Sequence, residues 1–266
     1  MIKLPAIHRF LENLAYPSVL FVLSVVFWEL GARLGWFPSY LLPAPTVIFE
    51  RLIKTVGLLS HHAVVTSAEI LLGFAIAVMV GVLLAVVIVF VRAVDRAIYP
   101  WLVFVQVIPK VALGPLLVVW LGFGFLPKVL MAFLLAFFPV MISAMIGFRS
   151  IEKDALFLLR SMGAGQFKTL LYLRLPTALP VIFGSLKVAI TLATVGAIVG
   201  EFIGANEGLG YVLVTANGVL DTALIFVALT WISALALLFY GAIALLERSF
   251  VRWHVSHRIL TELSTG

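Results

Sequence analysis

Three long stretches without a charged residue limit what this chain can fold into. They cover residues 70–91, 129–148 and 222–246, which are 22, 20 and 25 residues long. A hydrocarbon core about 30 Å thick is crossed by about 20 apolar residues in a helix, so each stretch can span a bilayer. Of the 266 residues, 64% are hydrophobic and 11% are charged, whereas soluble domains carry about 25% charged residues. We therefore exclude a soluble enzyme, a nucleic-acid-binding domain and a disordered scaffold, and expect an integral membrane protein in the lipid bilayer.

Three further segments complete the expected membrane spans. Residues 17–33 are mostly apolar and carry Glu29 and, at their end, Arg33, and residues 180–200 are interrupted by Lys187. Residues 97–127 are too long for one regular crossing and too short for two. Because proline removes a backbone donor and clashes with the preceding turn, we expect one crossing here, kinked or unwound near Pro109–Pro115. The sequence thus predicts an all-α chain, a single domain over 1–266, with six spans at about 17–33, 70–91, 97–120, 129–148, 180–200 and 222–246.

The distribution of lysine and arginine predicts the orientation of these spans. If the N-terminus is cytoplasmic, the inside segments 1–16, 92–96, 148–180 and 247–266 hold 12 of the 18 basic residues, and the outside segments hold four. Cytoplasmic loops carry the excess of basic residues in membrane proteins. Both termini are therefore expected in the cytoplasm, and the net charge of +6 needs no nucleic acid to explain it.

The longest expected cytoplasmic connection covers residues 149–179, here named the coupling loop. Its pattern predicts a short surface helix over 151–162, a break at Gly163 and Gly165, and a second amphipathic segment over 167–175 that ends at Pro176. Periodicity alone leaves two interpretations open. The hairpin either lies on lipid headgroups or docks onto a protein partner.

Several blocks of this sequence resemble the permeases of ABC importers. Gly163, Leu173 and Leu175-Pro176 match the second half of the cytoplasmic signature Glu-Ala-Ala, three residues, Gly, nine residues, Ile-x-Leu-Pro. The further matching blocks are 108–113 (IPKVAL), 115–124 (PLLVVWLGFG) and 200–211 (GEFIGANEGLGY). Over about residues 40–254 the chain is similar to nitrate/sulfonate/taurine-type permeases, with features of the vitamin-precursor branch.

This resemblance implies a type I importer fold, a bacterial inner-membrane location and a division of labour. Two copies of the chain would form the pathway for a small anionic or heterocyclic solute, which a solute-binding protein delivers outside. A cytoplasmic ABC ATPase dimer would hold ATP and Mg, so this chain itself would have no catalytic residue and no cofactor. The residues implied to contact the ATPase are Leu158, Leu159, Met162, Gly163, Ala164, Leu173, Leu175 and Pro176.

The sequence departs from the family signature at one place. Phe157, Leu158 and Leu159 stand where the signature has Glu-Ala-Ala. A carboxylate contact from position 157 to the ATPase is therefore excluded, while the glycine and the Leu-Pro pair keep the coupling role.

Polar residues inside spans mark candidate pathway positions, because they are costly in lipid and face a cavity or a partner. Gln106 and Lys110 are four residues apart at the broken third span, which predicts one shared helix face. Glu201 is the third candidate, with the alternative that it caps or braces the outer loop. Glu69 enters the second span, and Lys187 lies close enough to the cytoplasmic edge to snorkel.

Three other motifs in the sequence give weaker indications of function. Residues 163–169 resemble a phosphate-binding loop but lack the glycine before Lys168. His254 and His257 have helical spacing without a third ligand, so we predict no metal site. Gly196, Gly200, Gly204 and Gly208 predict close helix packing, within the chain or against a second copy.

An ion-coupled secondary transporter or a channel is the alternative function, although the chain shows no internal repeat of the kind that many such transporters have.

Overall fold

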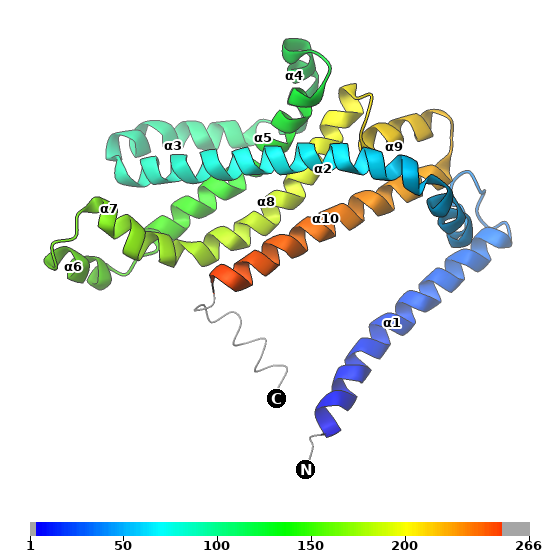
Figure 1. Ribbon diagram of the computed structural model, residues 1–266, viewed down its shortest axis with the longest axis horizontal. Coiled ribbons are helices and arrows are strands. Elements are labelled where there is room, and N and C mark those ends of the chain that lie inside the picture. The colour runs from blue at the N-terminus through cyan, green and yellow to red at the C-terminus, as the bar shows by residue number, and fades with distance from the viewer. Residues whose placement is uncertain (1–3, 252–266) are drawn as a thin grey trace.

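The computed structural model describes residues 4–251, and every regular element in that range is a helix. The prediction of an all-α chain is confirmed. Figure 1 shows an elongated bundle in which α2, α5, α8 and α10 run side by side, while α1 leaves the bundle at one end. The helices are α1 (Leu4–Arg33), α2 (Pro45–Phe90), α3 (Arg92–Val107), η1 (Lys110–Leu113), α4 (Gly114–Leu121), α5 (Phe125–Arg149), α6 (Lys153–Ser161), α7 (Gln166–Thr169), η2 (Leu170–Arg174), α8 (Leu175–Gly204), α9 (Leu209–Gly218) and α10 (Thr222–Phe250).

Four stretches of helix are long and apolar enough to cross a membrane: α2, α5, Gln166–Gly204 and α10. Three of them contain the predicted spans 129–148, 180–200 and 222–246, and α2 contains the predicted span 70–91 except for its last residue. The predicted span 17–33 lies within α1. The helix α2 begins 25 residues before the predicted start and has 46 residues, a length of about 69 Å, so it extends well beyond a hydrocarbon core. The C-terminal residues 252–266, which the orientation prediction uses, lie outside the described residues.

The predicted break in the third span is present. The helix α3 ends at Val107, and Ile108 and Pro109 adopt extended backbone conformations with ψ of 127° and 95°. A residue before proline disfavours the helical region, which places the interruption here. A 3₁₀ turn and the short helix α4 follow, and Figure 1 shows α4 leaving the direction of α3. The number of membrane crossings over 97–120 stays a prediction.

The centre of the bundle is the packing of α5 against α2 and α8. Small residues let these backbones approach closely. A Cβ on Gly196 of α8 would lie 2.6 Å from the carbonyl oxygen of Met131 in α5. Any larger residue at position 196 would therefore push the two helices apart. The glycine stripe of α8 thus packs against this chain's own helices.

The bundle places two candidate functional regions far apart. Figure 1 shows α6 and α7 at one end and α9 at the opposite end, with α5 and α8 connecting them. The connection 149–179 and the segment 205–221 therefore lie at opposite ends of the apolar bundle, as the predicted topology requires.

Candidate functional site: the coupling loop and the polar cluster

The helix α6 of the coupling loop presents an apolar surface that the other described residues leave uncovered. It follows an extended linker at Glu152, and none of its nine residues is buried within the described chain. Phe157, Leu158 and Met162 are 76%, 62% and 76% exposed. Leu159 is half-buried. Of the predicted contact residues, Leu158 and Met162 are therefore exposed and Leu159 is not. Phe157, which replaces the acidic residue of the signature, is also part of the exposed surface.

The turn after α6 explains the glycine at position 163. Gly163 has φ of +81°, and the space where a Cβ would stand is empty to 4 Å. Its N–H donates to Arg160 O at 2.9 Å, and the Ala164 N–H donates to Leu159 O at 3.1 Å. This pair of bonds is a Schellman motif, whose C′ residue takes the left-handed conformation that glycine adopts at least cost. Within this chain, backbone conformation and not close packing requires the glycine.

The segment after the turn differs from the prediction. A proline exit at Pro176 was expected, but α7, η2 and α8 form one continuous stretch of helix from Gln166 to Gly204, through Pro176. Just before the proline, Leu170–Arg174 forms a π turn, in which the Leu175 N–H donates to Leu170 O. A π turn widens the helix locally, and Pro176 follows it directly. The prediction of a helix end at Pro176 is therefore wrong.

The remaining predicted loop residues hold the loop to the bundle. Leu173, Leu175 and Pro176 are half-buried, and Leu175 packs against the main hydrophobic core. Arg174 donates from Nη1 to Phe148 O at 2.6 Å, which ties η2 to the end of α5. These contacts indicate that the residues around Leu173–Pro176 anchor the coupling loop to the bundle. The helix α6 is an exposed part of the loop.

Gln106 and Lys110 lie close together, but not on one helix face as predicted. The helix α3 ends at Val107, so Lys110 begins the 3₁₀ turn and folds back. Its Nζ donates to the backbone O of Gln106 at 3.2 Å and lies 4.8 Å from the ring centroid of Phe138. Lysine near a helix C-terminus stabilises the unpaired carbonyls there, and an aromatic face attracts the ammonium group.

Glu201 acts as a cap for α9. Its side chain is 2% exposed, and its carboxylate accepts bonds from the Gly210 N–H and from the Thr66 hydroxyl, the latter at 2.7 Å. The Thr66 oxygen in turn accepts from the Leu209 N–H at 2.8 Å. The first N–H groups of a helix lack partners within it and favour a negative charge. Of the two predicted roles, the surroundings of Glu201 favour the brace.

The same region holds a buried ion pair between α2 and α5. Lys128 Nζ lies 2.9 Å from Glu69 Oε1 and donates to Glu207 O at 3.3 Å. The Gly208 N–H donates to His62 Nδ1 at 3.0 Å. We name the set formed by His62, Thr66, Glu69, Lys128 and Glu201 the polar cluster.

Sequence reasoning placed Lys128 in an outer loop and did not assign His62 a role. The available signal was Glu69, because a carboxylate entering a span requires a partner. Lys187 likewise has one: its Nζ lies 2.7 Å from Glu247 Oε2 of α10. The described residues contain no group of three or more potential metal ligands, and His254 and His257 lie outside them.

Comparison with known proteins places this geometry in context. Residues 77–256 match the family described as binding-protein-dependent transport system inner membrane component. The chain is 37% identical over 254 residues to the riboflavin transport system permease protein RibX of Chloroflexus aurantiacus, covering 93% of this chain and 95% of that protein. It is 36% identical to the formylaminopyrimidine transport permease protein ThiX of Halalkalibacterium halodurans, covering 89% and 95%.

More distant relatives include sulfonate and taurine permeases. Among solved structures, the methionine ABC transporter MetNI in an inward-facing conformation matches with a TM-score of 0.61 at 20% identity, covering 74% of this chain and 98% of that chain. This structural match shows the same fold.

Proposed function

Because this chain belongs to the family of binding-protein-dependent transport system inner membrane components, we propose that an ATPase drives it through α6. The chain is a multi-pass membrane protein and a permease subunit of an ABC importer. Its relatives are permease subunits and not enzymes. ATP and Mg would bind to the separate ATPase, and a solute-binding protein would deliver the solute at the other face.

One observation carries the coupling proposal. The helix α6 projects from the end of the bundle with no buried residue. Phe157 and Leu158 on this helix, and Met162 directly after it, stay uncovered among the described residues. Burying an apolar side chain of this size stabilises a complex by about 1.5–3 kcal/mol. A cleft on the ATPase that receives these three side chains would give the docked helix a firm attachment.

Cysteine cross-linking tests this proposal, because the native chain contains no cysteine. A single cysteine at Leu158 should cross-link to the ATPase in the assembled complex, whereas one at the exposed Asn217 of α9 should not. Equal cross-linking at both positions, or at neither, contradicts the docking. Transport by the purified chain alone, without an ATPase, would support the secondary-transporter alternative instead.

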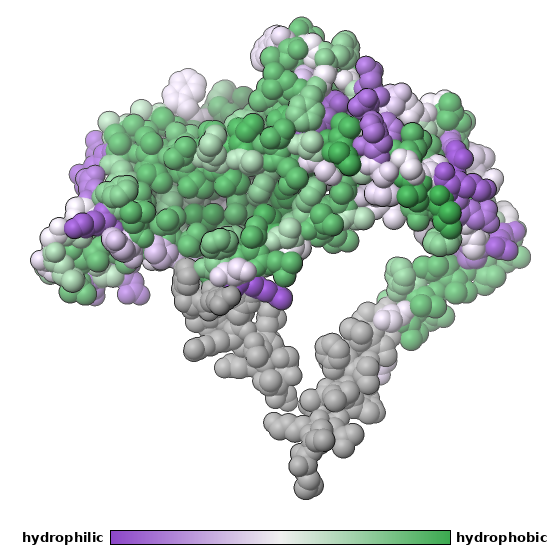
Figure 2. Space-filling model, viewed as in Figure 1, coloured by the Kyte–Doolittle hydropathy of each residue, from purple (hydrophilic) through white to green (hydrophobic). Residues whose placement is uncertain are grey.

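Two copies of the chain are proposed to form the pathway. Within one chain, large apolar side chains stay exposed on α1 and α4, including Leu20, Phe21, Val119 and Trp120. Figure 2 shows the apolar surface extending over most of the visible bundle. Lipid covers part of such a surface, and a second copy would cover the rest. Gln106 and Lys110, beside the break after α3, are the proposed pathway residues.

We propose a heterocyclic solute of the vitamin-precursor kind as the cargo. The relatives at 37% and 36% identity are named for riboflavin and formylaminopyrimidine, while the sulfonate and taurine relatives are more distant. Uptake by vesicles containing the permease, the ATPase and the binding protein should be competed by such heterocycles and not by taurine. The proposed location is the bacterial inner membrane, with both termini cytoplasmic.

A further inference from the structure

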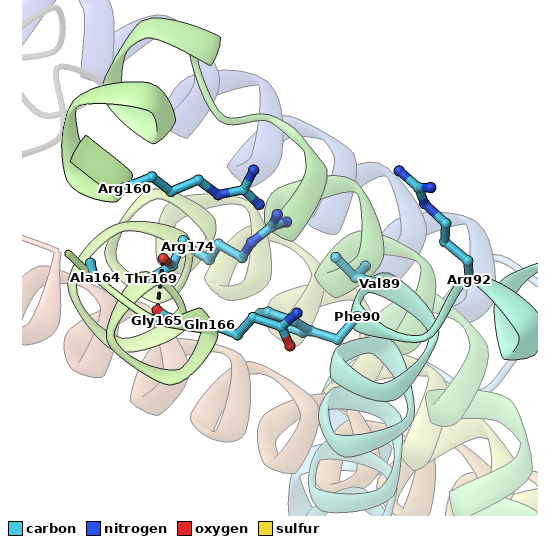
Figure 3. A pocket seen from close by; sticks show the side chains of 9 residues that line it. All are labelled: Val89, Phe90, Arg92, Arg160, Ala164, Gly165, Gln166, Thr169 and Arg174. Carbon is cyan, nitrogen blue, oxygen red and sulfur yellow. Dashed lines mark hydrogen bonds between the residues drawn. The ribbon is translucent and has the colours of Figure 1, made fainter. Parts of the chain in front are cut away.

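A cavity of about 540 Å³ lies between the coupling loop and the end of α2, and its charged lining is entirely basic. Three of the residues that line it are Arg92, Arg160 and Arg174, and among its described lining residues none is acidic. Figure 3 shows the guanidinium groups of Arg160 and Arg174 side by side, while that of Arg92 lies at the far rim. Two like charges held together destabilise each other unless an anion lies near them.

Arg174 is held in place before any ligand arrives. Its Nη1 donates to Phe148 O at 2.6 Å, and its guanidinium carbon lies 5.1 Å from the centroid of the Phe90 ring. Its Nε is shielded from solvent and has no hydrogen-bond partner among the described residues. Unpaired buried donors are rare in native proteins, and an ordered ion or water commonly accounts for them.

The neighbouring charges do not neutralise this cavity. Asp95, at the start of α3, already pairs with Arg149 at 2.6 Å. Among the ion pairs between described side chains, none involves one of the three cavity arginines. The described residues therefore leave the positive charge of the cavity available to a ligand.

The cavity lies where the apolar part of the chain ends. Phe90 is the last residue of α2, and Arg92 is the first residue of α3. Similarly, the uncharged run 129–148 ends directly before Arg149. Lipid phosphates lie at this boundary between hydrocarbon and water, and basic pockets between membrane helices on the cytoplasmic side bind anionic head groups. Arginine also presents a planar fork that matches two phosphate oxygens at once.

We propose that this cavity binds a phosphate group, namely that of an anionic phospholipid from the adjacent leaflet, between Arg160 and Arg174. The lipid joins the coupling loop, through Arg160 of α6, to Arg174 at the start of the long helix. The assignment to the cytoplasmic leaflet rests on the proposed function, whereas the binding itself does not.

The test is direct binding to the purified full chain after removal of lipid, measured by native mass spectrometry. Short-chain phosphatidylglycerol should bind about tenfold more tightly than phosphatidylcholine, because only the former keeps a net negative charge. Arg160→Gln should weaken phosphatidylglycerol binding about tenfold. The matched control is Lys168→Gln, which removes an exposed positive charge from α7 outside the cavity and should change binding less than twofold.

A second variant separates a guanidinium fork from simple charge. Arg174→Lys keeps the charge but loses the fork, so it should also weaken binding. Because Arg174 supports the end of α5, the exposed Arg160 variant decides the test if Arg174→Lys does not fold. Equal binding of the two lipids, or unchanged binding in Arg160→Gln, overturns the proposal.

Two further measurements identify the source of the anion. If inorganic phosphate competes with phosphatidylglycerol at similar concentration, the lipid is overturned as the natural ligand. If adding the ATPase expels the lipid, and a cysteine at position 160 cross-links to an acidic segment of that subunit, the lipid is overturned in favour of a protein partner. The binding assay itself uses no ATPase, so its failure leaves the docking of α6 untouched.

Discussion

Lys128 and Glu69 form an ion pair inside the bundle, with Nζ 2.9 Å from Oε1 and side chains that are 6% and 0% exposed. Neither Glu69 oxygen makes a well-aligned hydrogen bond with a described residue, so the contact is ionic. Glu201, also buried, belongs to the same cluster. One buried ammonium group thus faces two carboxylates, and the loss of Lys128 leaves both of them without a counter-charge in the polar cluster.

We expect Lys128→Met to be strongly destabilising, by about 3 kcal/mol or more, because it leaves Glu69 buried without its partner. The measurement is thermal unfolding of the purified chain in detergent. The double variant Lys128→Met/Glu69→Leu should recover part of the loss, since it removes both charges. Lys54→Met, at an exposed position of α2, is the control and should change stability little. Equal stability of the two lysine variants would contradict a structural role for the pair.

Gly163→Val should abolish ATP-dependent uptake while membrane insertion stays normal. Valine at φ of +81° costs about 1–3 kcal/mol in strain and alters the turn that orients α6. The matched control is Gly165→Val, because Gly165 has φ of −72° and equally open space around its Cβ position. Uptake and ATP hydrolysis are measured in vesicles that contain the ATPase and the binding protein. Full coupled activity in Gly163→Val would overturn the coupling role of this turn.

Lys110→Ala should reduce uptake several-fold without loss of ATPase association. The ammonium group lies at the break after α3, where it satisfies the backbone oxygen of Gln106 and faces the ring of Phe138. Gln106→Ala keeps that backbone oxygen, so it should reduce uptake less if the lysine charge is the functional group. Wild-type uptake kinetics in Lys110→Ala would remove this residue from the pathway.

Single cysteines at Asn206 and Gln166 should react with a membrane-impermeant reagent from opposite sides. Both residues are exposed and lie at opposite ends of the bundle. In sealed cells Asn206 should be labelled from outside, and Gln166 only after the membrane is opened. Labelling of Gln166 in intact cells would overturn the predicted orientation.

Three uncharged runs, and the run 180–200 that only Lys187 interrupts, located four long apolar helices because hydrophobic length is nearly sufficient to identify a membrane helix. Helix ends were harder to place. The first part of α2 was not predicted because residues 45–62 include polar side chains. A helix that extends out of the lipid does not need the continuous apolar sequence by which the span was recognised. At Pro176 the π turn removed the expected break, and no pattern in the sequence announces such a turn.

Among the candidate functional residues, those whose role depends on neighbours in the sequence could be predicted. The break at Gly163 and Gly165 was predicted because glycine interrupts a helical pattern, and the resemblance to the permease signature singled out Gly163. The partners of Glu69 and Lys187 were missed, because they lie 59 and 60 residues away along the chain, at Lys128 and Glu247. Pairing between separate helices depends on how the bundle packs, which a single sequence does not specify.

The continuity of Gln166–Gly204 has a mechanical consequence. These 39 residues form a rod about 58 Å long, with the Gly163 turn at one end and Glu201 near the other. Tilting such a rod by about 5° around its midpoint moves each end by about 2.5 Å, in opposite directions. That displacement is nearly the length of the hydrogen bond between Thr66 and Glu201, 2.7 Å. If the ATPase turns the Gly163 end as proposed, a rotation of this size would suffice to break or form the cap on α9, with the long helix as a lever between the two.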